Sequence, residues 1–200
     1  MNKIIPLLLA VALAGCADLS ISPVPGDISA DHWKTRQDYL VKLRAWTLTG
    51  RLAVQTEREG WTATLHWIQD NENYNMRFIA PLGQGTYELS GDVHKVSMLT
   101  ADNRFLQAND PERLMLDNLG WNVPLNGLKY WIRGLPEPGT TPDNMILDDK
   151  GRITDLQQSG WRISILRYAE IEGIDLPGKL FMQNDRFKLR LVIQDWKTTS

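Results

Sequence analysis

The sequence predicts a mainly β protein in which antiparallel strands form one large curved sheet or barrel. Three observations lead to this prediction. Apolar and polar residues alternate with a period of two in many short stretches, turn signals rich in Gly, Asn and Asp separate these stretches, and helices do not alternate with strands. Parallel strands need long crossover connections, so this order favours antiparallel meanders.

A helical pattern comes first, from Ser29 to about Ala45. Trp33, Leu40 and Leu43 recur near helical spacing, with polar residues between them. Ser29 or Asp31 is suited to cap the first turn. The preceding residues contain two prolines and a glycine and predict a flexible tether.

The first group of expected strands follows the helix. Its stretches are WTLTGRLAV (46–54), WTATLHW (61–67), YNMRFIA (74–80), TYELS (86–90), VHKVSML (93–99) and NRFLQ (103–107). In the first two stretches Trp46, Trp61 and Trp67 alternate with polar residues, mostly threonines. The tryptophans should therefore share the inner face of the sheet.

Two short helices interrupt the strands. The first is expected from Asp110, which is followed by proline and glutamate, to Gly120, and the second covers Leu125 to Ile132. Neither has a long sheet of its own, so both are candidates for covering the open face of the curved sheet or barrel. The second group of strands comprises NMILDD (144–149), RITDLQQ (152–158), WRISILRYAEI (161–171), KLFMQ (179–183) and FKLRLVIQDW (187–196). RITDLQQ breaks the alternation, which indicates a bulge.

Composition narrows the class of protein without fixing its function. The chain has 200 residues, 42% of them hydrophobic, and a formal net charge of -2, which favours one domain and gives no electrostatic reason to expect nucleic-acid binding. Eight tryptophans stand against four phenylalanines. They could fill a core or line an apolar cavity, and composition does not distinguish these alternatives.

The N-terminus has the pattern of a secretory signal peptide. A lysine at position 3 precedes an apolar run from Ile4 to Ala14, which is too short to span a bilayer. Leu13-Ala14-Gly15-Cys16 resembles the lipobox of bacterial lipoproteins. That resemblance implies cleavage before Cys16 and three acyl chains on it, enough for a permanent membrane anchor. The alternative is a free cysteine near an ordinary cleavage site.

The sequence lacks the motifs that would indicate a metal site or a catalytic site. His32, His66 and His94 do not stand at metal-ligand spacing, and the chain contains no nucleophile elbow, P-loop or dinucleotide fingerprint. Asp148-Asp149-Lys150-Gly151 favours a solvated hairpin turn over a cation loop. We therefore expect a protein that is not an enzyme and needs no metal or cofactor.

One turn contains an unusual residue. Pro81-Leu82-Gly83-Gln84-Gly85 joins two expected strands, and its proline and glycines are ordinary turn residues. Leu82 would stand at the tip, where a large aliphatic side chain has little to pack against. It either folds back onto its own hairpin or contacts something outside the protein.

Several stretches in order resemble the LolB family of outer-membrane lipoprotein receptors of Gram-negative bacteria. Besides the lipobox they are WTLTGRLAV, APLGQGTYEL, LGWNVPLNGLKYWIRGLPEPG and LQQSGWRISILRY, and together they span nearly the whole mature chain. The resemblance implies an incomplete antiparallel β-barrel of about 10–11 strands, with an N-terminal helix and short inserted helices as a lid over an apolar cavity. The implied segments are a signal peptide (1–15), a lipidated tether (16–28) and one lipid-binding domain (29–200) with a helical insert (110–135).

The resemblance also implies a task and its residues. The receptor would take lipoproteins from the soluble periplasmic carrier LolA and place them in the outer membrane. It would itself be anchored through Cys16 on the periplasmic face of that membrane, because Ala17, rather than the aspartate that retains lipoproteins in the inner membrane, follows the cysteine. Pro81, Leu82 and Gly83 would form the delivery loop. The expected partners are LolA, the acyl chains of cargo and the outer membrane, with no nucleic acid, and we expect a monomer. Combined with the alternation above, the candidate cavity residues are Trp46, Leu48, Leu52, Trp61, Leu65, Trp67, Met76, Phe78, Trp131 and Trp161.

Other functions remain open from the sequence. An envelope lipoprotein of the same fold could bind another amphiphile without taking cargo from a carrier. A structural lipoprotein would have a filled core and no bound lipid. A lipid hydrolase would need a nucleophile paired with a base, and Ser90, Ser97, Ser159 and Ser164 lack such a context.

Overall fold

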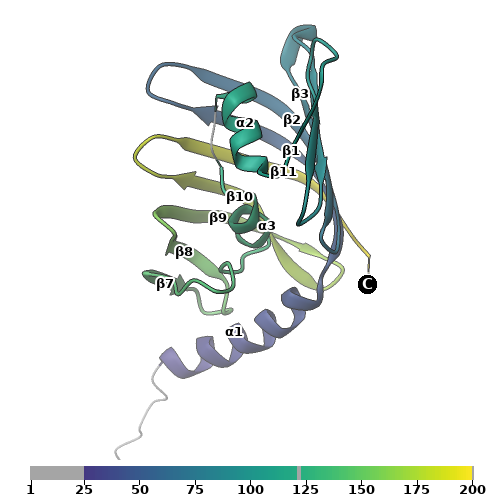
Figure 1. Ribbon diagram of the computed structural model, residues 1–200. Coiled ribbons are helices and arrows are strands. Elements are labelled where there is room, and N and C mark those ends of the chain that lie inside the picture. Colours follow the sequence, from purple (N-terminus) through teal and green to yellow (C-terminus); the bar gives the residue numbers. More distant parts are fainter. Residues whose placement is uncertain (1–24, 121–122, 200) are drawn as a thin grey trace, which may run out of the picture.

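The computed structural model describes residues 25–120 and 123–199 (Figure 1). These residues contain an antiparallel sheet of eleven strands in the order β6-β5-β4-β3-β2-β1-β11-β10-β9-β8-β7. Neighbours in the chain are neighbours in the sheet except that β11 pairs with β1, which joins the two groups of strands. Because β6 and β7 end the order without pairing to each other, the sheet is curved but not closed.

Every stretch expected to be extended contains a strand. The strands are β1 (Ala45–Gln55), β2 (Gly60–Asp70), β3 (Asn73–Ile79), β4 (Thr86–Gly91), β5 (Val96–Leu99), β6 (Phe105–Ala108), β7 (Asn144–Leu147), β8 (Ile153–Gln158), β9 (Trp161–Ile171), β10 (Ile174–Gln183) and β11 (Lys188–Thr199). The mainly β fold with an open, barrel-like sheet is therefore confirmed.

Two details of the strands differ from or refine the expectation. VHKVSML is extended only from Val96, because Asp92 Oδ1 accepts hydrogen bonds from the backbone N–H groups of His94 and Lys95 and folds the preceding residues into a turn. The bulge expected in RITDLQQ is confirmed, since Ile146 pairs with Asp155 while its neighbour Leu147 pairs with Ile153.

The pairing of β1 with β11, which connects the two groups of strands, depends on a close approach of their backbones. The register of β1 against β11 shifts between Thr49 and Gly50. A Cβ atom at Gly50 would lie 2.7 Å from the carbonyl oxygen of Val192, closer than a side chain tolerates. Glycine at this position therefore lets β11 lie against β1 at the bulge.

The helices are α1 (Pro25–Lys42), α2 (Pro111–Leu119) and α3 (Leu125–Trp131). The expected start of α1 at Ser29 is wrong, since the helix begins at Pro25 and so takes in the end of the expected tether; proline suits a first helical turn. Ser29 and Asp31 consequently lie inside the helix and do not cap it. The expected bounds of α2 are confirmed: Asp110 accepts a hydrogen bond from the Arg113 N–H, and Gly120 ends the helix in the left-handed conformation.

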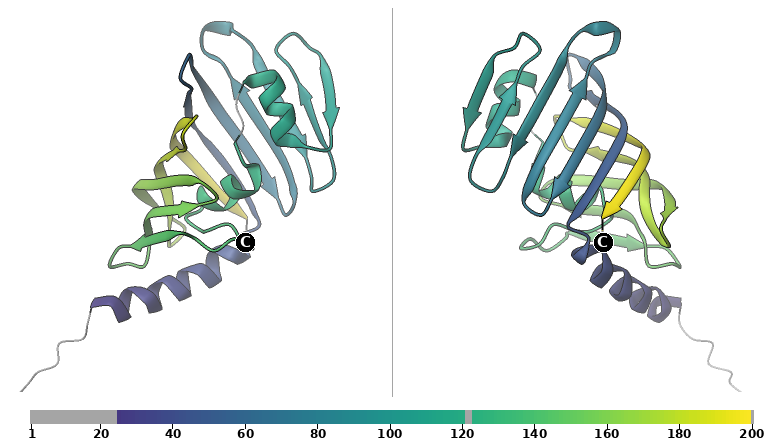
Figure 2. Two further views of the ribbon diagram at one scale, coloured as in Figure 1. Left: turned by 60° about the vertical axis from the view of Figure 1, so that its left-hand side comes forward. Right: turned by 90° about the vertical axis from the view of Figure 1, so that its right-hand side faces the viewer.

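The curved sheet holds α2 and α3 on its inner side, and α1 lies near the β7 end of the sheet (Figures 1 and 2). His32 Nδ1 of α1 lies 3.2 Å from the Asp149 carbonyl oxygen in the β7–β8 turn. At the other end of α1, the Arg133 guanidinium donates to the carbonyl oxygens of Leu40 (3.2 Å) and Leu43 (2.6 Å). Burial lowers the pKa of Arg133 to about 10. The cation remains protonated at neutral pH and fixes the end of α1 beside α3.

Candidate functional site

The inner face of the sheet and the two inserted helices enclose an apolar space. Leucine, methionine and aromatic side chains surround it, and its free volume is about 20 Å³. The lining residues come from β1, β2, β3, β10 and β11, from α2 and α3, and from the segment before α3; they are Leu52, Leu65, Trp67, Met76, Phe78, Met115, Val123, Leu125, Leu128, Met182, Leu189 and Leu191. Since a ligand pocket usually measures roughly 300–1,000 Å³, the helices fill this space almost completely.

Five of the ten candidate cavity residues line that space, namely Leu52, Leu65, Trp67, Met76 and Phe78. Trp46 and Leu48 are also buried but do not line the space, and the Trp46 ring lies 5.1 Å from that of Trp67 and 5.4 Å from that of Trp196. Trp61 is half-buried, with its ring 6.2 Å from that of Phe78. The structure thus brings together the candidates on β1, β2 and β3.

Trp131 and Trp161 form a separate contact. Their ring centroids are 6.2 Å apart, where α3 packs on β9, and both side chains are buried. Neither lines the space under the helices. A side chain at the end of a helix and one at the start of a strand can satisfy the same apolar pattern without facing the same cavity, which explains why the pattern did not separate them.

The candidates missed residues from the helices and from the end of the chain. Met115 belongs to α2, and Met182 and Leu189 belong to β10 and β11. The signal was present in FKLRLVIQDW, whose leucines alternate with Lys188 and Arg190. Only the pairing of β11 with β1 places them opposite Leu52 and its neighbours.

Polar contacts attach α3 to the sheet. The buried side chain of Gln158 accepts hydrogen bonds from the Trp131 indole N–H at 2.9 Å and the Glu137 N–H at 2.8 Å. Lys129 Nζ donates to Glu72 Oε2, in the turn between β2 and β3, at 2.8 Å. These bonds hold α3 and the segment after it against β8 and the β2–β3 turn.

The attachment of α2 to the sheet is apolar. Its buried residues are Leu114 and Met115. The ion pair of Arg113 with Asp117 is internal to the helix. Burial, helped by the nearby charge of Asp110, raises the pKa of the Glu112 carboxyl, which accepts a hydrogen bond from the backbone of Leu125 in α3. Because apolar contacts have no directional requirement, other apolar groups can replace those that α2 makes with the sheet.

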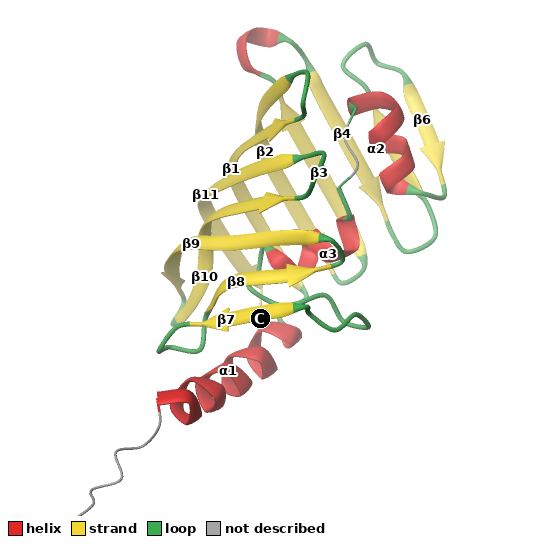
Figure 3. Ribbon diagram, turned by 90° about the vertical axis from the view of Figure 1, so that its left-hand side faces the viewer, coloured by secondary structure: helices red, strands yellow, loops and turns green. Residues whose placement is uncertain are grey.

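The turn between β3 and β4 presents Leu82 to solvent. Its side chain is 98% exposed, and its backbone is left-handed with φ 55°. The Ala80 N–H donates to the Gly85 carbonyl at 3.0 Å and the Gln84 N–H donates to the Pro81 carbonyl at 3.2 Å, which fixes the turn. Residues Pro81–Gly83 form a short 3-10 helix in this turn, and Figure 3 shows it at the end of the sheet remote from α1. The leucine does not fold back onto its own hairpin.

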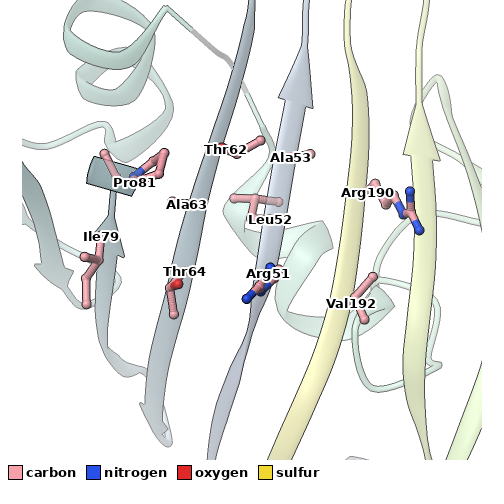
Figure 4. Close-up of a pocket in the computed structure, with 11 residues that line it drawn as sticks. Arg51, Leu52, Ala53, Thr62, Ala63, Thr64, Ile79, Pro81, Arg190 and Val192 are labelled. Atoms are coloured by element: carbon pink, nitrogen blue, oxygen red, sulfur yellow. The ribbon is translucent and has the colours of Figure 1, made fainter. Parts of the chain in front are cut away.

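A second hollow lies on the outer face of the sheet. It has a volume of about 650 Å³ and crosses β11, β1, β2 and the end of β3. Figure 4 shows Arg51 and Arg190 at this hollow, with Thr62 and Thr64 between Arg51 and Pro81. The threonines and Ala53 are small, which leaves the surface depressed between larger neighbours.

The remaining expected features are placed as follows. Cys16, the signal peptide and the first part of the tether lie outside the described residues. Within residues 25–120 and 123–199, no three His, Cys, Asp or Glu side chains are grouped so as to hold a metal ion. The helices of that part of the chain do not combine the length and the apolar character needed to cross a bilayer. His66 lies on the outer face, with Nδ1 3.1 Å from Thr49 Oγ1.

Comparisons with known proteins agree on one family. Residues 44–196 match the family model described as Outer membrane lipoprotein LolB. A protein of Nitrosococcus oceani named Outer-membrane lipoprotein LolB is 39% identical over 191 residues, which cover 96% of this chain and 94% of the relative. A protein of the same name from Pseudomonas aeruginosa is 37% identical over 186 residues, covering 92% and 90%.

A solved structure shares the fold at low sequence identity. A LolA superfamily protein from Nitrosomonas europaea superposes with a TM-score of 0.52 and 8% identity, covering 86% of this chain and 94% of that one. At this identity the similarity concerns the fold alone.

Proposed function

The chain belongs to the LolB family of outer-membrane lipoproteins, and from this membership we propose that it is a receptor that accepts lipoproteins from the periplasmic carrier LolA and incorporates them into the outer membrane. The anchor would be Cys16, exposed by removal of residues 1–15, and the protein would face the periplasm. The proposed role is binding and transfer, with no catalytic step.

The observation that carries the proposal is the apolar interior beneath α2 and α3. An acyl chain of about 16 carbons exposed to water costs roughly 0.8 kcal/mol for each methylene, so cargo needs continuous shelter during transfer. The twelve apolar residues around the interior offer that shelter without directional demands. Its present free volume of about 20 Å³ is too small for a chain, so acceptance requires the acyl groups to displace a helix.

The contacts favour α2 as the element that is displaced. Leu114 and Met115 attach it by apolar packing, whereas α3 is tied by Gln158 and Lys129. An acyl chain entering from the side of α2 replaces one apolar contact by another, which keeps the difference in free energy small. Transfer can then follow a gradient of affinity from carrier to receptor to bilayer, without nucleotide hydrolysis.

Pro81, Leu82 and Gly83 would act at the last step. A side chain that is 98% exposed at the tip of a fixed turn can enter the headgroup region of a bilayer without unfolding the sheet. The insertion of one leucine would hold the opening of the receptor near its target while cargo leaves.

A transfer assay tests the proposal. Purified LolA is loaded with a fluorescently labelled lipoprotein and mixed with the Cys16→Ala form produced without its signal peptide, and liposomes are added later. We expect the label to move first to this protein and then to the liposomes. The same cargo without acyl chains is the control and should not move. If the acylated label stays on LolA, the receptor function is refuted, and the ligand must be sought among amphiphiles that copurify.

A further inference from the structure

Six cationic side chains gather on the outer face of four adjacent strands. They are Arg51 on β1, Lys188 and Arg190 on β11, Lys179 on β10, and Arg162 and Arg167 on β9. We call this set the basic face. Lys179 is half-buried and the other five are exposed.

The strand register brings these residues into rows across the sheet. Arg51 and Lys179 both stand opposite Val192, and Arg167 stands opposite Lys179. In a second row, Lys188 and Arg162 both stand opposite Gln183. With neighbouring strands about 4.8 Å apart, four strands spread the charge over roughly 15 Å.

Acidic side chains are absent from the positions paired in these rows, as far as the structure describes them. Carboxylates lie at the borders of the basic face: Asp155 on β8 accepts a hydrogen bond from Ser164 Oγ at 2.7 Å, and Asp195 lies opposite Thr49 further along β11. At the start of β9, Asp143 and Asp185 line a hollow together with Arg162. None of the six cations forms an ion pair with another described residue. A concentration of positive charge on one face of a chain with net charge -2 indicates an anionic partner for that face.

The basic face continues into the Leu82 turn. Arg51 and Arg190 both line the hollow of about 650 Å³ on the outer face, and Pro81 lines its other side. Figure 4 shows these residues around the same depression. Cationic side chains on one side of the hollow, and on its other side the turn that carries the exposed Leu82, match the two layers of a bilayer surface, with anionic headgroups outside and acyl chains beneath.

We propose that the basic face binds the headgroups of anionic phospholipids and holds the outer side of the sheet against the bilayer while Leu82 enters it. This inference rests on the proposed function, because the bilayer is where cargo would be released. The charge is spread over a broad sheet surface rather than concentrated in a cleft, which favours a membrane surface over a single anionic molecule. An acidic protein surface is the competing partner, and the test separates the two.

The test measures sedimentation of the Cys16→Ala protein, produced without its signal peptide, with vesicles of phosphatidylethanolamine, with and without phosphatidylglycerol. One variant carries Arg51→Gln and Arg190→Gln. The matched control carries Lys34→Gln and Lys150→Gln, which removes the same charge from exposed positions on α1 and the β7–β8 turn. If Arg51→Gln with Arg190→Gln disturbs folding, as judged by thermal unfolding, a variant with Lys179→Gln and Lys188→Gln is used instead.

We expect phosphatidylglycerol to increase binding of the parent protein and the Arg51/Arg190 variant to lose about 30-fold of that binding, which corresponds to about 1 kcal/mol for each charge. The control should lose much less. High salt should abolish the difference, because it screens exposed charges beyond a few ångströms.

Three results would overturn the inference. If binding of the parent protein to vesicles does not depend on phosphatidylglycerol, anionic headgroups are not the ligand. If the variant and the control lose vesicle binding equally, the loss reflects the net charge of the protein and not the basic face. If the Arg51→Gln/Arg190→Gln variant binds vesicles normally but takes up less cargo from LolA, the partner of the basic face is an acidic protein surface. Failure of the proposed function is distinguishable, because cargo transfer from LolA would then be absent in the parent protein while its vesicle binding remains measurable.

Discussion

Replacing Leu82 by glutamate should separate cargo acceptance from cargo delivery. The side chain is 98% exposed and lines none of the interior, so its replacement removes no packing from the core. The interior beneath α2 and α3 stays intact in the variant. We therefore expect Leu82→Glu to fold, to take cargo from LolA at the parent rate, and to pass it slowly to liposomes.

The magnitudes follow from the exposure and the backbone conformation. An exposed substitution changes the free energy of unfolding by at most about 0.5 kcal/mol. Burying a leucine in an apolar phase contributes roughly 1.5–3 kcal/mol, so the loss of that contribution should slow delivery by about 10- to 100-fold. Leu82→Asn is the matched control for the turn, because asparagine tolerates the left-handed conformation at φ 55° and also lacks the apolar side chain.

The assay follows labelled lipoprotein from LolA to receptor and from receptor to liposome as two separate rates, together with thermal unfolding of each variant. Leu82→Asn should fold at least as well as the parent and be slow only in the second step. Loss of folding in Leu82→Glu would show that the leucine stabilises the domain. Delivery at the parent rate by both variants would show that the exposed leucine is not used in insertion.

Three further changes test the packing of the fold. Gln158→Ala should destabilise the protein by about 3 kcal/mol in urea unfolding, since it removes the partner of the Trp131 and Glu137 N–H groups, whereas Gln157→Ala on the outer face should cost less than about 0.5 kcal/mol. Gly50→Ala should cost about 2 kcal/mol by the same measurement, because its Cβ would meet the Val192 carbonyl oxygen at 2.7 Å; an unchanged midpoint would show that the bulge relaxes. Burial, assisted by the nearby Asp92 carboxylate, raises the pKa of the Tyr74 hydroxyl from 10.0 to about 12. The unfolded state therefore loses the hydroxyl proton at a lower pH than the folded state, and the free energy of unfolding should fall as pH rises from 10.0 to about 12. The Tyr74→Phe variant should lose less stability between those pH values. Because the buried hydroxyl has no hydrogen-bond partner among the residues that the structure describes, the variant should fold at least as stably as the parent at neutral pH.

The strands could be predicted because their signal is local. The period of two assigned Trp46, Leu48 and Trp67 to the inner face, and all three are buried there. The capping signal at Asp110 and the glycine at 120 likewise fixed α2, since both act within a few residues of the helix end.

The pairing that builds the sheet could not be predicted in the same way. β11 lies against β1 although the two are more than a hundred residues apart in the chain, and alternation indicates a face without indicating a neighbour. For this reason the residues of β10 and β11 that complete the interior were missed, and the basic face, which collects cations from four strands, was not visible in the sequence.

The sequence by itself determined the order of the strands and helices and the inward side of most of them. It also carried the resemblance of residues 13–16 to a lipobox and of longer stretches to a family of receptors, because each of these features depends on short-range patterns or motifs. Only the tertiary structure decided that Leu82 projects into solvent, that α2 and α3 fill the interior to about 20 Å³, and that the cations meet on one outer face. These properties depend on which distant segments come into contact, and burial, free volume and electrostatic potential exist only once those contacts have formed.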